Sequence, residues 1–146
     1  MMRNYVEVSS DGRIVCAGFS EIPDGAPLPE GVARRVFLDA PPPEHRTHYW
    51  DGQRFHPMGE PPSHAHRFNF KSKTWALDLT LALEMVRQRR DELLAASDWI
   101  TLRSHERGTP VPQQWLAYRQ ALRDLPATVT DEQSMMAVAW PQAPTA

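Results

Sequence analysis

Proline clusters limit what this chain can fold into more than any other feature of its sequence. The 146 residues include 14 prolines, and proline ordinarily makes up only about 5% of a chain. Proline fixes its own φ and cannot donate a backbone hydrogen bond, so helices and central strands must fit between the clusters. We therefore expect short folded modules joined by stiff, extended connections. The clusters lie at 23–29, 41–43, 57–62, 110–112 and 141–144.

Residues 1–40 are predicted to form a small β module. Two β-prone runs, at 5–8 and 13–16, flank the sequence Ser-Ser-Asp-Gly. Asp-Gly between such runs is a hairpin signal, because both residues tolerate positive φ. A proline-rich loop follows at 20–31, and Arg34–Leu38 is a further candidate strand.

Residues 41–77 are predicted to form two aromatic β-hairpins separated by a proline-rich spacer. The first pairs 47–50 with 53–55 around Asp51-Gly52, and the second pairs 66–70 with 74–77. Aromatic side chains that face each other across neighbouring strands stabilise small sheets. Hairpins this short bury little surface alone, so they need to pack against each other, against helices or against a partner.

The pattern becomes helical from residue 78 onward. Apolar residues recur at three- and four-residue steps from Leu79 to Leu94. Asp78 and Thr80 are candidate caps at the start, and the helix should end near 96–98. A loop is expected at 101–108.

A second helix is predicted to begin at Thr109-Pro110, with Thr109 as cap and Pro110 in the first helical position. Its apolar face would carry Trp115, Tyr118 and Leu122, and Pro126 would end it. Two helices joined by a short loop form an antiparallel hairpin, and the tail after it should be extended.

These elements together predict an α+β fold. Its parts are an N-terminal small β module at 1–40, proline-spaced aromatic β-hairpins at 41–77, and a C-terminal antiparallel helical hairpin with an extended tail at 78–146.

Composition and motifs exclude several classes of function. The net charge of −2, from 16 basic and 18 acidic residues, gives no electrostatic case for binding nucleic acid or an anionic membrane. The single cysteine, Cys16, excludes a disulfide within the chain and favours a reducing compartment. No apolar run approaches the roughly 20 residues that span a bilayer. No nucleophile elbow, zinc-protease motif, P-loop or dinucleotide-binding glycine pattern is present, so we predict no catalytic residue, no cofactor and no enzyme activity.

Histidines raise the one metal hypothesis that the sequence offers. His64 and His66 would lie on one side of a strand. Three chains around a threefold axis could then ligate one octahedral metal with these rings. Exposed histidines beside prolines are the more ordinary interpretation, and we predict no metal.

Three blocks of sequence in the C-terminal half occur together in a known family. They read RQRRDELLAASDW at 87–99, WLAYRQALRDLP at 115–126, and WPQAP at 140–144. This combination resembles the phage tail assembly chaperone family, a small domain of tail fibre assembly proteins. The sequence at 104–107, Ser-His-Glu-Arg, departs from the acidic, proline-containing loop typical of that family.

The resemblance implies a function in holding another protein. It implies a non-enzymatic bacteriophage tail accessory protein that binds a tail fibre protein and assists fibre assembly in the host cell cytoplasm. The alternative is a structural virion component, such as a fibre-to-baseplate adaptor or hinge, that stays in the tail. Baseplate proteins are further candidate partners, and the sequence leaves a homo-oligomer open.

Seven residues of the helical hairpin and tail are the candidate partner-binding residues. Each also has a structural interpretation: Trp99, Trp115 and Tyr118 would complete the core, while Asp98 would pair with an arginine of the hairpin or cap a turn. An ion-pair network between the helices would then involve Arg90, Asp91, Arg119, Arg123 and Asp124. Trp140 would either pack back on the helices or insert into a partner. The candidates are Trp99, Trp115, Tyr118, Arg119, Arg123, Trp140 and Pro141.

Overall fold

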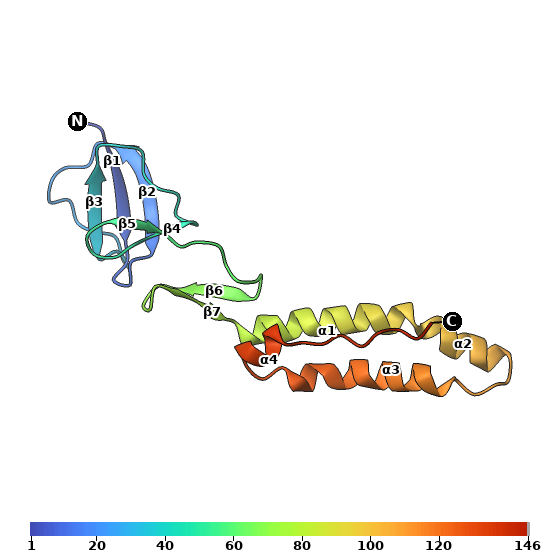
Figure 1. Ribbon diagram of the computed structural model, residues 1–146. Coiled ribbons are helices and arrows are strands. Elements are labelled where there is room, and N and C mark those ends of the chain that lie inside the picture. Colours follow the sequence, from blue (N-terminus) through green and yellow to red (C-terminus); the bar gives the residue numbers. More distant parts are fainter. Residues whose placement is uncertain (146) are drawn as a thin grey trace. The chain divides into compact units, whose positions relative to one another are not determined.

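A computed structural model describes residues 1–145 and divides the chain into two compact units, Met1–Ala76 and Leu77–Ala146 (Figure 1). Strands occupy residues 3–77 and helices occupy residues 79–136, which confirms the predicted α+β fold class. Whether the first unit contains two separable domains, with a boundary at 40/41, stays a prediction.

The first unit begins with an antiparallel sheet of three strands. β1 (Arg3–Val8) lies in the centre, between β2 (Ile14–Ser20) and β3 (Arg34–Leu38) (Figure 1). In the turn between β1 and β2, only Gly12 adopts the positive φ expected of the Asp-Gly pair, at +88°. Asp11 instead accepts a hydrogen bond from the Ser9 hydroxyl, which holds the pKa of its carboxyl below the usual range.

The two faces of this sheet are stabilised differently. On one face Val6, Val8 and Ile14 are buried and pack against Trp50 and other partly buried side chains. On the opposite face a buried ion pair joins neighbouring strands, because Glu7 and Arg35 are register partners. Arg35 Nε donates to Glu7 Oε1 at 2.8 Å.

Both aromatic hairpins form and pack against each other, but the second strand of the first hairpin lies at Phe55–Pro57 and not at the predicted 53–55, because its turn spans four residues, 51–54. They comprise β4 (His48–Trp50) with β5 (Phe55–Pro57), and β6 (His66–Asn69) with β7 (Thr74–Leu77). Ring centroids lie 4.7 Å apart for Trp50 and Phe55 and 5.4 Å apart for Phe68 and Trp75, each pair within one hairpin. Tyr49 and Phe68, 5.2 Å apart, join the two hairpins, so their mutual packing supplies burial that neither has alone.

Asp51 fixes the turn of the first hairpin. Its carboxylate accepts hydrogen bonds from the backbone N–H groups of Gln53, at 2.7 Å, and Arg54, at 2.8 Å. These two donors, Arg54 first, together with His56, hold the pKa of Asp51 far below its usual value. The Asp-Gly signal therefore works here through the aspartate side chain as well as through the glycine.

The second unit contains more helices than the sequence predicted. Its elements are α1 (Leu79–Ala96), α2 (Asp98–Glu106), α3 (Gln113–Asp124), a 3-10 turn (Leu125–Thr128) and α4 (Glu132–Met136). The loop predicted at 101–108 is wrong, because α2 covers most of it.

The start predicted for the second long helix, at Thr109-Pro110, is also wrong. α3 begins at Gln113, with Pro112 in the capping position. A proline disfavours helical backbone in the residue before it, so Pro112 keeps Val111 out of a helix. Within the predicted extended tail, α4 forms because Asp131 and Ser134 make a capping box.

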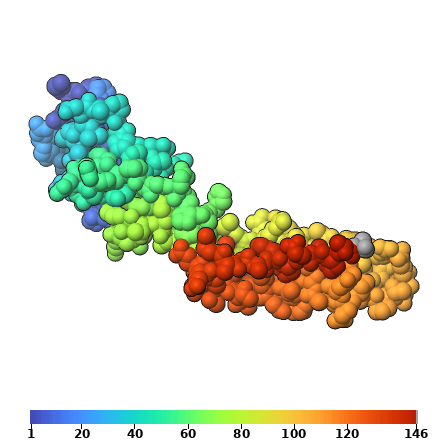
Figure 2. All heavy atoms as spheres, viewed as in Figure 1, coloured from blue at the N-terminus to red at the C-terminus, as the bar shows by residue number. Residues whose placement is uncertain are grey.

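The core of this unit lies between α1 and α3. Val86 and Leu122 are almost completely buried, and Leu125 and Val129 close the core after α3. The chain then returns along the helices as an extended segment, visible as a dark red row in Figure 2. Trp140, in that segment, packs against both hydrophobic clusters of the unit.

Replacement of Asp78 by alanine should destabilise α1. Asp78 Oδ1 accepts a hydrogen bond from the Leu81 N–H at 3.1 Å, as the predicted N-cap. Loss of such a cap costs about 1 kcal/mol in the free energy of unfolding. Urea unfolding followed by the helical circular dichroism signal measures this loss, and Asp78→Asn, which keeps the acceptor, is the control. Equal stability of D78A and the native chain would contradict the capping role.

Candidate partner-binding site

The α1–α2–α3 connection presents an aromatic and cationic surface, which we call the tip surface: Trp99, Leu102, Arg103 and Arg107. Trp99 is 43% exposed and Leu102 is 60% exposed. Trp99, Arg103 and Arg107 follow one another at four-residue steps, so they share one side of α2 and its end. The helix thus arranges apolar area and positive charge side by side.

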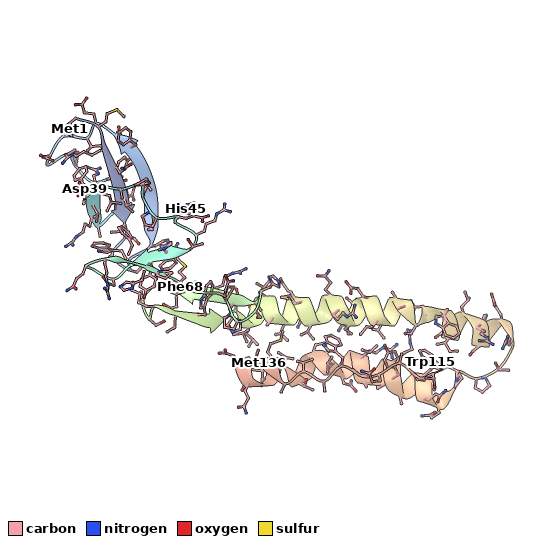
Figure 3. The ribbon with its side chains drawn as sticks, turned by 45° about the horizontal axis from the view of Figure 1, so that its top comes forward. Met1, Asp39, His45, Phe68, Trp115 and Met136 are labelled. Atoms are coloured by element: carbon pink, nitrogen blue, oxygen red, sulfur yellow. The ribbon has the colours of Figure 1, made fainter. Side chains whose placement is uncertain are left out.

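A groove runs between α2 and the segment that leads into α3, at the end of the unit where Figure 3 labels Trp115. Its volume is about 260 Å³. Two arginines line it, and no acidic residue does. Its lining residues are Trp99, Ile100, Arg103, Ser104, Arg107, Thr109, Pro110, Pro112, Gln114 and Trp115.

A series of ring contacts holds Trp99 in place. Its ring meets Trp115 edge to face, with centroids 5.6 Å apart, and Trp115 meets Tyr118 in the same way at 5.8 Å. The Arg103 guanidinium lies 5.9 Å from the Trp99 ring centroid, a distance typical of a cation–π contact. Trp99 is therefore supported from the core side and open to solvent on another.

The expectation that Trp99 closes the core is wrong. Ile100, its neighbour, takes that place and is 6% exposed in the cluster with Trp115 and Leu122. The reason is α2 itself: in a helix adjacent side chains point about 100° apart, so turning Ile100 inward leaves Trp99 half outside.

Arg119 ties the start of α2 to both long helices. Its guanidinium donates to the Leu94 carbonyl at 2.9 Å, the Ser97 hydroxyl at 2.6 Å and the Asp98 carboxylate at 2.8 Å. The predicted pairing of Asp98 with an arginine of the hairpin is thus confirmed. Ser97 is buried, and Arg119 is mostly buried, so the bonds to Leu94 and Ser97 are shielded from water, whereas Asp98 is exposed.

The wider ion-pair network predicted between the helices is wrong. Within residues 1–145, Arg119–Asp98 is its one pair that joins different helices. Arg90 pairs with its neighbour Asp91 on α1, while Asp124 accepts from Gln120 on its own helix.

The structure separates the seven candidate residues into an exposed and a supporting group. Trp115 and Tyr118 are each 7% exposed and belong to the core. Arg119 is committed to the contacts described above, and Trp140, beside Pro141, is half-buried because it packs back on the helices. Trp99 and Arg123 are exposed. The sequence analysis missed Leu102, Arg103 and Arg107, whose three- and four-residue spacing from Trp99 was the available signal.

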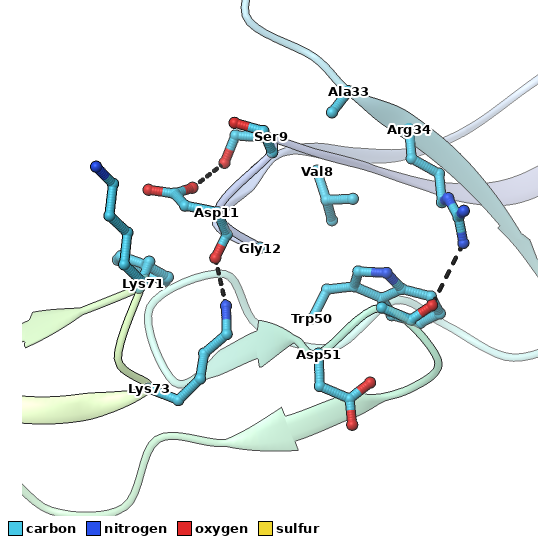
Figure 4. Close-up of a pocket in the computed structure, with 13 residues that line it drawn as sticks. Val8, Ser9, Asp11, Gly12, Ala33, Arg34, Trp50, Asp51, Lys71 and Lys73 are labelled. Atoms are coloured by element: carbon cyan, nitrogen blue, oxygen red, sulfur yellow. Dashed lines mark hydrogen bonds between the residues drawn. The ribbon is translucent and has the colours of Figure 1, made fainter.

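The first unit has its own hollow, formed where the β1–β2 turn meets the two hairpins (Figure 4). Its volume is about 700 Å³. Two of its cations bind backbone carbonyls, because Lys73 Nζ donates to the Asp11 oxygen and Arg34 donates to the Gly52 oxygen at 3.3 Å (Figure 4). These bonds connect segments far apart in sequence, which favours a structural role.

The histidine pair does not have the arrangement that the metal hypothesis required. His64 is exposed and precedes β6, while His66 is buried at the first position of that strand. Across residues 1–145 there is no cluster of three or more His, Cys, Asp or Glu side chains that could hold a metal ion.

No helix in the described part of the chain is both long and apolar enough to cross a membrane.

Replacement of Arg119 should loosen the tip. Arg119→Ala removes three hydrogen bonds from a charged donor, and such bonds contribute about 1.5–3 kcal/mol each when buried. Because Asp98 is exposed, its share is small, and the two remaining bonds give an expected total loss of about 3 kcal/mol or more in urea unfolding. Arg123→Ala, an exposed arginine one turn further along α3, is the matched control and should change stability by less than about 0.5 kcal/mol. Equal effects of the two substitutions would contradict the role of Arg119.

A comparison with known protein families gives a match that lies within the helical unit. The model of one family, described as phage tail assembly chaperone protein, matches residues 83–145. Neither the curated proteins nor the solved structures gave a match. The matched region contains α2, α3, the tip surface and the returning tail. Residues 83–145 are therefore similar to the phage tail assembly chaperone family, which confirms the resemblance seen in the sequence.

Proposed function

We propose that this chain is a non-enzymatic tail accessory protein that binds a tail fibre protein through the tip surface and assists fibre assembly. The family match supports a role in phage tail assembly. Beyond that role, we propose that the partner is the fibre, that the tip is the contact surface and that the chain has no catalytic activity.

The observation that carries the proposal is an exposed tryptophan held rigidly beside unpaired arginines. Among the described residues, neither Arg103 nor Arg107 forms an ion pair. Tryptophan and arginine are the residues most enriched at the energetic centres of protein interfaces. A side chain fixed before binding loses little conformational entropy on binding, and ring contacts fix Trp99 in this way.

The remaining candidate residues contribute to partner binding in two ways. Trp115, Tyr118 and Arg119 position the tip from inside, since they are buried or committed to internal contacts. Arg123, Trp140 and Pro141 lie on or near the outer surface of the helical unit, where they extend the contact beyond the tip.

A structural virion component, acting as a fibre-to-baseplate adaptor or hinge, is the second candidate. The first unit favours it, because proline-rich segments alternate there with hairpins that carry their own aromatic contacts. The location separates the two candidates: an assembly helper acts in the host cell cytoplasm, whereas an adaptor stays in the virion tail with fibre and baseplate proteins. Mass spectrometry of purified particles distinguishes these locations.

Co-expression with the tail fibre gene tests the proposed function. We expect the chain to raise the yield of soluble, trimeric fibre and to co-purify with it. A fibre that reaches the same yield and trimer content without the chain would contradict assistance in assembly.

Substitutions at the tip test the contact surface. Trp99→Ala and Arg103→Glu should each weaken fibre binding about 10-fold or more, the scale of an interface hot spot, as measured by calorimetry with purified fibre. Met136→Ala is the matched control, because Met136 is 66% exposed but lies on α4. Unchanged affinity of both tip variants would refute the surface while leaving fibre binding itself intact.

A further inference from the structure

The groove between α2 and the segment that leads into α3, which we call the tip groove, carries positive charge that nothing in the described chain neutralises. Arg103 and Arg107 line it and are exposed. Within residues 1–145 neither has an ion-pair partner. Glu106, the one acidic residue between them in sequence, does not line the groove and pairs with neither.

The end of α2 does not use these guanidinium groups either. The carbonyls of residues 103–105 accept backbone N–H groups of residues 107–109, so the helix end has its hydrogen-bond partners. Side chains four residues apart on a helix are neighbours, and Arg103 and Arg107 can therefore reach the same bound group. The cation–π contact of Arg103 with Trp99 uses the face of the guanidinium and leaves its N–H groups free.

Trp115 adds a second donor to the tip groove. Its side chain is almost fully buried, and a buried indole N–H usually has a hydrogen-bond partner. Trp75 follows this rule, because its Nε1 donates to the Met58 carbonyl at 3.0 Å, but within residues 1–145 the indole N–H of Trp115 has no acceptor. No fully buried side-chain nitrogen or oxygen in the described chain lacks a partner, so this N–H reaches solvent, and Trp115 lines the tip groove.

The size and walls of the groove favour part of a polypeptide as its occupant. A volume of about 260 Å³ lies below the roughly 300–1,000 Å³ of pockets that enclose small molecules, and it suits the side chains of a larger partner. Pro110 and Pro112, across from α2, have no N–H, and the Pro112 carbonyl already accepts from the start of α3. The strongest polar groups on offer are thus donors, beside the exposed ring of Trp99.

We propose that the tip groove binds an acidic peptide segment, in which one carboxylate bridges Arg103 and Arg107 while a neighbouring apolar side chain covers Trp99. Another oxygen of the segment accepts from the indole N–H of Trp115. Charge complementarity selects this occupant, because arginine binds carboxylates through paired, charge-assisted hydrogen bonds. The inference rests on the proposed function, in which the tail fibre protein supplies the segment, and it adds the chemistry that the segment must have.

Selection of short random peptides displayed on ribosomes, with the full chain as bait, tests this chemistry without the fibre. Enriched peptides should carry Asp or Glu beside a large apolar residue. Fluorescence anisotropy of one such synthetic peptide then measures its affinity, which should fall as salt is added. The double variant Arg103→Gln with Arg107→Gln should bind it about 10-fold or more weakly. Arg87→Gln, which changes an exposed arginine of α1, is the matched control and should bind normally.

A charge exchange sharpens the test. The double variant Arg103→Glu with Arg107→Glu should reject the acidic peptide and prefer the same peptide with lysine in place of its acidic residues. Enriched peptides without acidic residues, or native affinity in both double variants, would overturn the inference. Displacement of the peptide by single-stranded DNA as readily as by an acidic peptide of equal charge would overturn it too, because the groove would then bind nucleic acid.

Nuclear magnetic resonance gives a reading that needs no substitution. The indole N–H signal of Trp115 should shift when the acidic peptide is added, while that of Trp75, which already has an acceptor, should stay in place. An unchanged Trp115 signal in the presence of saturating peptide would refute the assigned contact.

Competition with purified fibre separates this inference from the proposed function. If Trp99→Ala weakens fibre binding but no acidic peptide is selected, the inference fails and the tip surface stands. If an acidic peptide binds the groove but does not compete with the fibre, the groove keeps its assigned ligand class, and the fibre fails as the partner at the tip.

Discussion

The arrangement of the helices in the second unit depends on the guanidinium of Arg119. Arg119 reaches from α3 to the Leu94 carbonyl near the end of α1, to Ser97 between the helices and to Asp98 at the start of α2, so it holds the place where the chain changes direction. The Leu94 carbonyl also accepts from the Ser97 N–H and hydroxyl, and the guanidinium, a planar donor with five N–H groups, adds a bond to this carbonyl while holding the Ser97 hydroxyl and the Asp98 carboxylate. Because this contact is largely shielded from water, it can define the direction in which α2 leaves α1.

The direction of α2 creates the tip surface. Once Ile100 turns into the core, helical geometry leaves Trp99 outside, with Trp115 behind it. Arg103 and Arg107 follow on the same side because of the four-residue spacing. The surface proposed for partner binding is thus a consequence of how the core is filled, and its rigidity has the same origin.

The first unit is stabilised mainly by contacts between aromatic rings. Its strands are too short to form a large core, so aromatic rings carry the packing from hairpin to hairpin, and Trp50 connects them to the apolar face of the three-stranded sheet. Backbone carbonyls near its turns are bound by side chains from distant segments, as with Lys73 and Asp11.

The sequence alone determined the α+β class, most strand positions, a helix start capped by Asp78 or Thr80, and the family resemblance, because local patterns and turn residues specify these features. Tertiary structure decided the rest. Residues 101–106 have no strong helical periodicity, and their helix forms because Ile100 is buried and Arg119 holds the start of α2. This packing also decides which tryptophan is buried, and the spacing of residues in the sequence does not show it.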